Sequence, residues 1–432
     1  MKMLVLGAGV IGTTAAWYLS QSGHEVTVVD RQTRAGNETS FANGGQISVS
    51  HAEPWANPHA PMKLVKWLAR DDAPLLLRPR LDPAQWRWCV QFLIECLPSR
   101  TRHNIAQLVR LGLYSRASLQ ALRAETGIAY DHLQRGILHF YTDAHEFDAA
   151  QAPAQVMRDH GCEIEMIDAD RCVQIEPALA TARDRLVGGS FTPTDESGDA
   201  HRFTVELARL GGERGVQFLT GTRILGLTRV GDRIESVRVV DANGSPGTLR
   251  ADAYVMALGS YSPLMLNKVG IDAPIYPTKG YSVTIPVGAQ HTAPQVSLTD
   301  DEYKIVFSRL GDRLRCAGTA ELNGYDTELN EVRCRAIVDR LFTLFPNAGD
   351  RSQVRYWTGL RPSTPSNVPL IGRSRIGNLY LNTGHGTLGW THACGSGRAL
   401  ADIVSGRAPE VDFAFLGGAR PKRNPAPALV NA

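Results

Sequence analysis

The feature that most constrains this chain is a glycine-rich turn between two short apolar segments near its amino terminus. Residues 3–6 are apolar, residues 7–12 are Gly-Ala-Gly-Val-Ile-Gly, and residues 25–29 form a second strand pattern that ends at Asp30. In such a strand–turn–helix unit the first glycine permits a tight turn, the second leaves room for a pyrophosphate, and the third lets the helix pack closely. The helix amino end then faces the phosphate. The pattern predicts a dinucleotide-binding α/β domain.

An acidic residue completes the predicted dinucleotide clamp. The carboxylate of Asp30 is placed where it can accept hydrogen bonds from ribose hydroxyls. Arg31 leaves one alternative open, because an arginine at this place can meet the 2′-phosphate of NADP. The predicted clamp consists of Gly7, Gly9, Val10, Ile11, Gly12, Asp30 and Arg31.

Length and composition favour a two-domain protein that acts on a small molecule. The chain has 432 residues, more than one hydrophobic core usually serves. Its 46 basic and 43 acidic residues leave a formal charge of +3 with no run of like charges, which disfavours a nucleic-acid surface. The seven cysteines form no CxxC pair and no metal-binding spacing with histidine, so we expect reduced thiols, a cytoplasmic location and no metal.

The amino terminus also has the charged-then-apolar pattern of a secretory signal, with Lys2 before residues 3–17. The glycine clamp lies inside this segment, so cleavage would destroy it, and we expect the segment to be retained. No later segment approaches the ~20 consecutive apolar residues of a membrane-spanning helix. We therefore expect a soluble or peripheral protein.

Hydrophobic periodicity predicts alternating helices and strands along the rest of the chain. A helix over 147–160 is expected to be capped near Asp143. The segment 253–260 is an apolar strand that ends at a glycine, and 378–386 leads through a second glycine turn into a helix over 390–405. The other predicted helices are 86–97, 104–125, 201–214 and 331–345, and the other strands are 137–141, 216–219, 234–240, 248–257, 281–286 and 303–307.

The order of these patterns predicts a discontinuous Rossmann-type domain with an interleaved α+β substrate domain. The substrate domain is expected to carry a mostly antiparallel sheet and a helical insert. This arrangement suits a flavin better than a nicotinamide. The predicted dinucleotide domain comprises 1–60, 161–270 and 350–420, the substrate domain comprises 61–160 and 271–349, and 421–432 is expected to be a flexible tail.

Seven stretches together resemble a known enzyme family. The chain resembles the D-amino acid dehydrogenase small subunits, flavoenzymes within the broader glycine oxidase and D-amino acid oxidase group. The first stretch is shared by many dinucleotide proteins, whereas the last two together are specific. The matching stretches are VLGAGVIG (5–12), VVDRQ (28–32), ETSFANGGQ (38–46), ALGSYSP (257–263), PTKGYSVTIP (277–286), WTGLRPSTPS (357–366) and NTGHGTLGWTHACGSGRALAD (382–402).

The resemblance implies a non-covalently bound FAD. It places Ser40, Asn43, Gly44 and Gly45 along the isoalloxazine ring. The late glycine turn would bring a helix amino end toward the flavin's pyrimidine edge, where it stabilises negative charge on reduction. The alternative is an ordinary strand-to-helix turn. The further cofactor contacts implied are Gly259, Gly384, Gly386, Thr387, Leu388 and Gly389.

Arg361 is the residue that we expect to bind the substrate, because a guanidinium meets a carboxylate with two parallel hydrogen bonds. The alternative is a loop brace beside Pro362. Tyr281 and Tyr303 are candidates for a phenol that completes the carboxylate site, or else ordinary strand aromatics. His385 is a weaker candidate base, because hydride transfer from a neutral amine needs mainly orientation. His51 is weaker still.

The resemblance implies oxidative deamination of D-amino acids to 2-oxo acids and ammonia, with electrons passing to a quinone or the respiratory chain. The alternatives are an oxygen-using oxidase of glycine, sarcosine or another secondary amine, an NAD(P)-linked dehydrogenase, and a flavin-bound subunit whose partner carries the catalysis. The sequence departs from the family pattern at Gly44, at Thr387 and at the pair Ser366–Asn367. One carboxylate anchor of the oxidase relatives, whose place Thr387 takes, is therefore missing or replaced, and the capping of the arginine loop is in doubt.

The segment 86–97 contains two tryptophans and follows the basic residues Lys63, Lys66, Arg78 and Arg80. An amphipathic face of this kind can rest on a membrane surface, and this would suit an enzyme that reduces a quinone at the inner face of the cell membrane. Packing in the core is the alternative that we favour.

Overall fold

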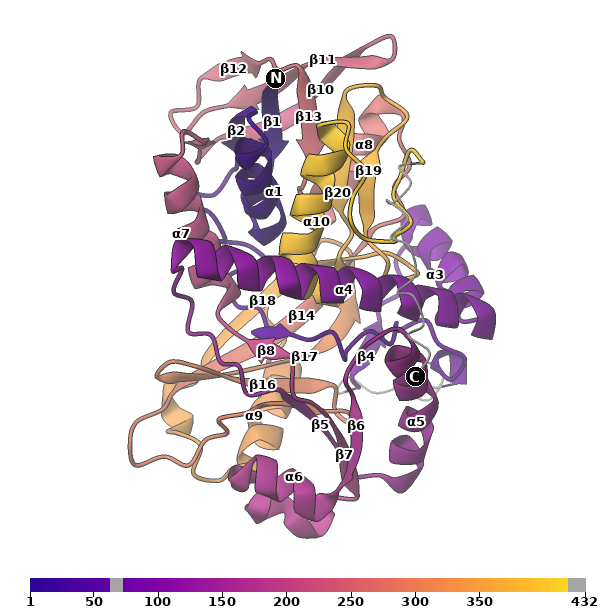
Figure 1. Ribbon diagram of the computed structural model, residues 1–432, viewed down its shortest axis with the longest axis vertical. Helices are drawn as coiled ribbons and strands as arrows, with labels where there is room; N and C mark the ends of the chain where they lie inside the picture. Colours follow the sequence, from indigo (N-terminus) through magenta and orange to yellow (C-terminus); the bar gives the residue numbers. More distant parts are fainter. Residues whose placement is uncertain (63–72, 419–432) are drawn as a thin grey trace, which may run out of the picture.

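The computed structural model describes residues 1–62 and 73–418. Two sheets occupy the two ends of the molecule, and the long helix α4 (Pro98–Thr126) crosses between them (Figure 1). This helix begins at Pro98, which has no amide hydrogen to lose, and ends before Gly127, whose positive φ of 65° suits a left-handed C-cap. The predicted class, an α/β domain combined with an α+β region that carries a mostly antiparallel sheet, is confirmed.

The first sheet has six strands in the order β19-β20-β13-β1-β2-β9, all parallel except β19. Side chains of β1 alternate between two layers: Met3 and Val5 pack toward helices, whereas Leu4 and Leu6 pack toward a three-stranded antiparallel sheet. The six strands are β1 (Lys2–Leu6), β2 (Glu25–Val29), β9 (Gln217–Leu219), β13 (Ala253–Met256), β19 (Leu370–Arg373) and β20 (Leu379–Thr383). The two layers are α1 (Val10–Gln21), α7 (Ala200–Glu213) and α10 (Gly389–Val404) on one face, and β10 (Arg223–Val230), β11 (Arg233–Val240) and β12 (Pro246–Leu249) on the other.

The second sheet has nine strands and is mostly antiparallel. Its main path runs β18-β14-β17-β16-β15-β5-β7-β6, and β4 pairs with β17. One face packs on α9 (Glu331–Leu344), and α6 (Ala169–Ile175) and η1 (Pro177–Arg185) join the same core. The strands are β4 (Leu75–Leu77), β5 (Ile137–Tyr141), β6 (Glu165–Asp168), β7 (Gly188–Thr192), β14 (Tyr276–Pro286), β15 (Ser297–Asp300), β16 (Ile305–Leu310), β17 (Arg313–Leu322) and β18 (Arg355–Ser363).

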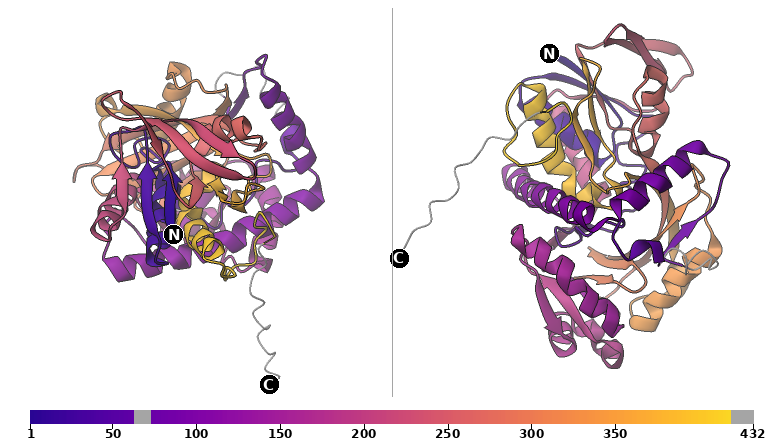
Figure 2. Two further views of the ribbon diagram at one scale, coloured as in Figure 1. Left: turned by 90° about the horizontal axis from the view of Figure 1, so that it is seen from above. Right: turned by 90° about the vertical axis from the view of Figure 1, so that its right-hand side faces the viewer.

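Two further helices flank the boundary between the sheets. Helix α3 (Pro83–Glu95) lies at the periphery of the molecule in the view from above (Figure 2) and begins where Asp82 accepts a hydrogen bond from the amide of Ala84. Helix α5 (Ala144–Asp159) begins at the predicted cap, Asp143. The remaining short elements are β3 (Gln46–Ile47), β8 (Glu196–Ser197), η2 (Gly259–Tyr261), α8 (Ser262–Leu266), η3 (Asn267–Val269), η4 (Arg351–Gln353) and η5 (Gly386–Leu388).

Two strand predictions are wrong. The predicted strand 248–257 is broken: β12 ends at Leu249 in the three-stranded sheet, and β13 begins at Ala253 in the six-stranded sheet. The chain changes sheets at Asp252, whose carboxylate accepts a hydrogen bond from the amide of Lys2. The predicted strand 303–307 starts too early, because Tyr303 lies in a turn and β16 begins at Ile305.

The predicted domain boundaries stay a prediction, but strand pairing refines them. Strands β6, β7 and β18 belong to the nine-stranded sheet, although 161–270 and 350–420 were expected to build the dinucleotide domain. Helix α4 packs against α10 of the first sheet, where the amide of Gly395 donates to Ser115 Oγ at 2.9 Å. The predicted tail, 421–432, lies outside the described residues.

Candidate functional site

The turn between β1 and α1 has a backbone that only glycine allows. Gly7 has a φ of 109°, and a Cβ on it would lie 2.5 Å from the carbonyl oxygen of Ala257. A Cβ on Gly12 would lie 1.8 Å from the carbonyl oxygen of Gly7, so the helix packs directly on the turn. At Gly9 the nearest heavy atom to such a Cβ is 3.6 Å away, on Ser40. The space that the second glycine was predicted to leave is therefore present.

The amino end of α1 offers its amide groups to an anion. Its N-cap, Gly9, has no side chain to accept from them, and the amide of Val10 donates to Ser40 Oγ at 3.0 Å. A second uncapped helix end lies at Leu388, where α10 begins after the turn with positive φ at Gly384 and Gly386. Two such helix ends in one domain suit a cofactor with negative charge at both its pyrophosphate and its ring.

Asp30 lies beside the glycine turn. Its two carboxylate oxygens accept hydrogen bonds from the amides of Ala8, at 2.7 Å, and Gln32, at 2.8 Å. Burial raises the pKa of Asp30, against the opposing effect of these two bonds. The neighbouring Arg31 pairs with Glu38, and its guanidinium carbon lies 4.1 Å from the centre of the Tyr261 ring. Arg31 is therefore already engaged, which disfavours a role in binding a 2′-phosphate.

A cavity of about 520 Å³ lies on the other face of the nine-stranded sheet, away from the α9 core. Helices α4 and α5, the loop 43–60 and the turn before α10 enclose it. The cavity thus connects the predicted flavin-lining segments with the larger sheet. Of the residues predicted from the sequence, it brings together Asn43, Gly44, His51, Arg361, Thr387 and Leu388.

The side chain of Arg361 extends from β18 across β14 toward β17. Its Nη1 donates to the carbonyl oxygen of Thr319 at 2.8 Å. The guanidinium lies directly over Gly280, since a Cβ there would be 2.3 Å from Cζ of Arg361. Burial, with some repulsion from Arg333, lowers the pKa of Arg361 to about 10, so the side chain stays cationic near neutral pH. Among the described residues no carboxylate pairs with Arg361, which leaves it available to an anion in the cavity.

The two predicted phenols lie elsewhere. Tyr281 faces the α9 core, where its hydroxyl donates to Glu321 Oε2 at 2.6 Å. Tyr303 is 41% exposed and stacks under Arg340 at 3.9 Å. Neither tyrosine lines the cavity. The structure therefore does not bring a tyrosine from these two positions to Arg361.

His385 is buried at the glycine turn before η5, outside the cavity lining. Within residues 1–62 and 73–418, neither of its ring nitrogens has a hydrogen-bond partner. Burial, with a smaller contribution from His392, lowers the pKa of His385 far below its ordinary value, so the ring is neutral. A buried imidazole with two unused polar atoms fits a turn that is completed by a bound molecule.

The structure adds a cluster that the sequence did not predict, the His139 cluster, made of His51, His139, Asp301 and Lys304. His139 Nδ1 lies 2.8 Å from Asp301 Oδ2, and Lys304 Nζ lies 2.8 Å from Asp301 Oδ1. The rings of His51 and His139 are 5.6 Å apart between centroids. All four residues line the cavity. The available signal was a histidine in the middle of the apolar strand Ile137–Tyr141.

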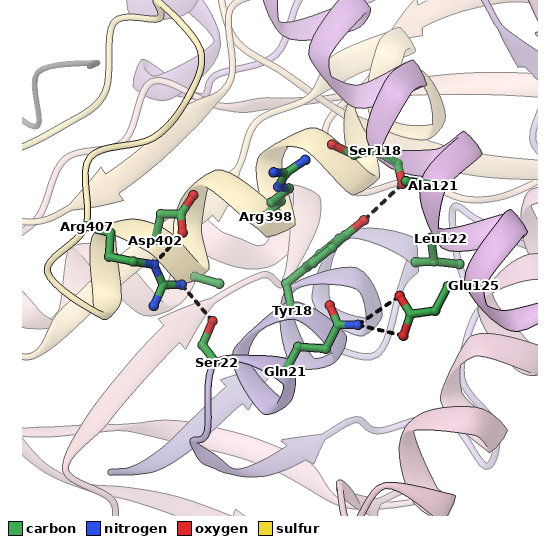
Figure 3. Close-up of a pocket in the computed structure, with 11 residues that line it drawn as sticks. Tyr18, Gln21, Ser22, Ser118, Ala121, Leu122, Glu125, Arg398, Asp402 and Arg407 are labelled. Atoms are coloured by element: carbon green, nitrogen blue, oxygen red, sulfur yellow. Dashed lines mark hydrogen bonds and ion pairs between the residues drawn. The ribbon is translucent and has the colours of Figure 1, made fainter. Parts of the chain in front are cut away.

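A second, more open pocket of about 280 Å³ lies where α1, α4 and α10 meet (Figure 3). Its polar groups are engaged with one another: Tyr18 donates to the carbonyl oxygen of Ser118, Gln21 donates to Glu125, and Arg407 pairs with Asp402 (Figure 3). Tyr18 and Gln21 lie at the carboxyl end of α1, away from the glycine turn. This pocket is not part of the candidate site.

Comparison with known proteins identifies relatives over nearly the whole chain. Residues 2–403 match the model of a family described as FAD dependent oxidoreductase. A D-amino acid dehydrogenase of Dechloromonas aromatica is 59% identical over 96% of this chain and 100% of its own length. A D-amino acid dehydrogenase of Paramagnetospirillum magneticum is 54% identical over 96% and 98%.

Solved structures support the fold. Glycine oxidase from Geobacillus kaustophilus has a TM-score of 0.73 at 20% identity, with 98% of this chain and 99% of that chain covered. L-proline dehydrogenase from P. horikoshii has a TM-score of 0.72 at 19% identity, with 94% of each chain covered. At these identities the likeness shows the architecture, and the chemistry must be argued from the site.

Proposed function

We propose, from the premise that this chain belongs to the FAD dependent oxidoreductase family, that it oxidises D-amino acids to 2-oxo acids and ammonia. The observation that carries the proposal is the agreement between close relatives named D-amino acid dehydrogenase and a cavity with an unpaired arginine cation among the described residues. The substrate loses two electrons and two protons to give an imino acid, which water hydrolyses to the 2-oxo acid and ammonia.

FAD is the cofactor of the family, and the residues of this chain fit it. When bound, FAD would supply the acceptor for the hydride that leaves the substrate's α-carbon. We propose that Gly7, Gly9, Gly12 and Asp30 hold its adenosine diphosphate half without a covalent bond. The turn residues Gly384 and Gly386 would then direct the amino end of α10 toward the ring, as the sequence predicted. The remaining predicted contacts, which stay proposals, are Val10, Ile11, Ser40, Asn43, Gly44, Gly45, Gly259, Thr387, Leu388 and Gly389.

We propose that Arg361 holds the substrate's α-carboxylate with two parallel hydrogen bonds. No other group of the chain is needed to take up the α-hydrogen, because orientation at the ring supplies most of the rate enhancement for such a transfer. His385, being neutral and buried, is assigned a positioning role at the turn. In this proposal Arg361 holds the carboxylate, and neither Tyr281 nor Tyr303 contributes to its binding.

The proposal is tested by mixing the yellow protein with D- and L-amino acids in the absence of oxygen. We expect D-alanine to bleach the flavin absorbance and L-alanine to leave it unchanged. The same mixtures in air separate a dehydrogenase, which forms little hydrogen peroxide, from an oxidase, which forms one peroxide per substrate oxidised. A protein that no D-amino acid bleaches would contradict the proposal.

Gly280 offers a test of the Arg361 geometry that leaves Arg361 itself in place. In Gly280→Ala the new Cβ occupies the position of the guanidinium, so the flexible arginine side chain must shift. We expect the KM for D-alanine to rise about tenfold, the ratio that 1.4 kcal/mol of lost binding gives. Gly247→Ala on β12 is the matched control, because its Cβ meets its nearest neighbour at an ordinary 3.4 Å. Equal KM values in the two variants would contradict the placement.

Helix α3 supports a finer proposal about the electron acceptor. Its inner side buries Trp88 and Phe92, as core packing predicts, whereas the outer side and Leu97, the second residue after the helix, expose apolar side chains. Helical spacing places these on one stripe. The exposed fractions in this α3 stripe are 49% for Trp86, 58% for Val90, 51% for Leu93, 48% for Ile94 and 54% for Leu97.

We propose that the α3 stripe rests on the inner face of the cell membrane, from which the enzyme passes electrons to a quinone. An apolar face bounded by polar residues is the form that surface-bound helices take. Among the described residues no helix is long and apolar enough to cross the bilayer.

The α3 stripe is tested by vesicle binding. Val90→Asp combined with Leu93→Asp is expected to lower the fraction of protein that sediments with anionic phospholipid vesicles at least fivefold, because each charge disfavours insertion of the apolar face. Val332→Asp is the matched control, since Val332 is 54% exposed on α9. Reduction of the bound flavin by D-alanine, measured without vesicles, shows whether each variant is folded. Equal sedimentation of both variants would contradict the membrane proposal.

A further inference from the structure

One face of the nine-stranded sheet forms the floor of the cavity. Strand pairing places His139 opposite Thr299, Thr299 opposite Val306, and Val306 opposite Ala317. Residues that pair directly point to the same face of a sheet, and all four line the cavity. The floor therefore runs from the imidazole of His139 across the side chains of Thr299, Val306 and Ala317. It ends at β17, the strand to which Arg361 is hydrogen bonded.

The imidazole at the end of this floor has a fixed orientation. Lys304 and His139 hold the pKa of Asp301 well below its usual range, although burial alone would raise it, so Asp301 is ionised. An ionised carboxylate only accepts hydrogen bonds, and His139 Nδ1 at 2.8 Å must therefore carry the hydrogen. In the neutral ring this leaves Nε2 as an acceptor. His139 is 5% exposed, and Nε2 has no partner among the described residues.

An unused acceptor in such a place has an energetic consequence. A buried polar atom left without a partner destabilises the site, so a ligand that donates a hydrogen bond to it is favoured over one that cannot. Burial lowers the pKa of the adjacent His51 to about 4, so this neighbour is neutral near neutral pH and adds no competing charge. Lys304 already balances the charge of Asp301.

The distance between Arg361 and His139 sets the length of such a ligand. The guanidinium of Arg361 is hydrogen bonded on β17, and β5 lies three strand intervals away, or about 14 Å at the usual spacing. Carboxylate binding at Arg361 and a hydrogen bond at His139 take up about half of this span. The remainder, roughly 7 Å, corresponds to a side chain with three or four methylene or carbonyl carbons and a terminal nitrogen.

We propose that the His139 end of the cavity is a side-chain subsite for linear D-amino acids that end in an N–H donor, such as the amide of D-glutamine or the ammonium group of D-lysine. This inference rests on the proposed function, with Arg361 holding the α-carboxylate. Thr299, Val306 and Ala317 form a surface over which the methylene chain lies, and His139 Nε2 accepts the terminal hydrogen bond. Asp301 is a positioning residue, because it acts on the ligand through His139.

The test compares substrates of similar length by anaerobic reduction of the bound flavin at pH 8.5. D-Glutamine is paired with D-methionine, and D-lysine with D-norleucine, so that each pair differs chiefly in the terminal donor. D-Glutamate adds a side chain of the same length without a donor. We expect the apparent dissociation constant of at least one donor substrate to be about tenfold below that of its partner and below that of D-glutamate.

Variants at His139 then test whether this residue causes the preference for substrates with a terminal donor. In His139→Leu the ratio within each pair is expected to fall to about one, whereas His139→Gln, which keeps an acceptor, is expected to retain most of it. Ratios within one variant cancel general losses of activity. His103→Leu, at an exposed histidine of α4, is the matched control and should keep the native ratio.

The outcomes separate this inference from the function on which it rests. A preference in the amide pair identifies neutral side chains as the ligand class, and a preference in the ammonium pair identifies cationic ones. Ratios of one or less in both pairs, a preference for D-glutamate, or a native ratio in His139→Leu would each overturn the subsite while D-alanine still bleached the flavin. Absence of bleaching by every D-amino acid would overturn the proposed function instead.

Discussion

Arg361→Lys is expected to lower kcat/KM for D-alanine about 100-fold, and Arg361→Leu about 1,000-fold. Removing one partner of a buried charged pair costs about 2–5 kcal/mol, and lysine keeps the charge but loses the planar fork that binds a carboxylate with two parallel bonds. The loss should fall mainly on KM, because the carboxylate contact is made in the bound substrate as well as in the transition state. Initial rates with an artificial electron acceptor measure it.

Two features keep this experiment specific. Arg309→Lys is the control, because Arg309 lies on β16 of the same sheet, donates to the carbonyl oxygen of Gly311 at 2.7 Å and does not line the cavity. The flavin absorbance of each variant reports whether the protein is folded and loaded. Unchanged kinetics in Arg361→Lys would remove Arg361 from the carboxylate site and with it the geometry on which the side-chain subsite depends.

Arg361 and Tyr281 lie on two paired strands, and their sequences differ in how much they reveal about the side that faces the cavity. The specific stretch around Arg361 predicted a carboxylate-binding arginine, and the structure places it in the cavity. Tyr281 lies in β14, whose residues from Tyr276 to Val283 are all buried. A strand buried on both faces has no alternation of polar and apolar residues, so its sequence does not reveal which face meets the cavity.

The sequence did not predict the turn at Tyr303, because the residues around it are typical of a strand. Residues 303–307 contain tyrosine, isoleucine, valine and phenylalanine, which are all common in strands. The turn is made instead by Asp300, whose carboxylate accepts a hydrogen bond from the amide of Tyr303 at 3.2 Å, and by Lys304, which has a φ of 53°. Two consecutive aspartates before the tyrosine were the available signal, since aspartate often bonds to its own backbone in turns.

The His139 cluster could not be predicted because its members meet only in the folded sheet. His139 and Asp301 are 162 positions apart and come together through the parallel pairing of β5 with β15. The pairing of strands that are distant in sequence is set by the whole domain, whereas the glycine turn is set by ten adjacent residues. Local backbone geometry was therefore predictable, and the composition of the cavity wall required the structure.

Gly12→Ala is expected to give a colourless protein that does not retain FAD. The added Cβ would lie 1.8 Å from the carbonyl oxygen of Gly7, and that oxygen cannot withdraw easily because a Cβ at Gly7 would itself lie within 2.5 Å of the Ala257 carbonyl oxygen. The backbone on both sides of the turn is thus closely packed. Helix α1 must move away from β1, and its amino end then no longer faces the pyrophosphate.

The retained ratio of flavin to protein, taken from the absorbance of the purified variant, measures this effect, and we expect it to fall at least 100-fold. Circular dichroism distinguishes loss of the cofactor from loss of the fold. Gly212→Ala is the matched control, because Gly212 lies on α7 with no heavy atom within 4 Å of the added Cβ. Alanine also has the higher helix propensity, so this control should retain FAD and be slightly more stable. Full flavin content in Gly12→Ala would mean that the cofactor is not held at the amino end of α1.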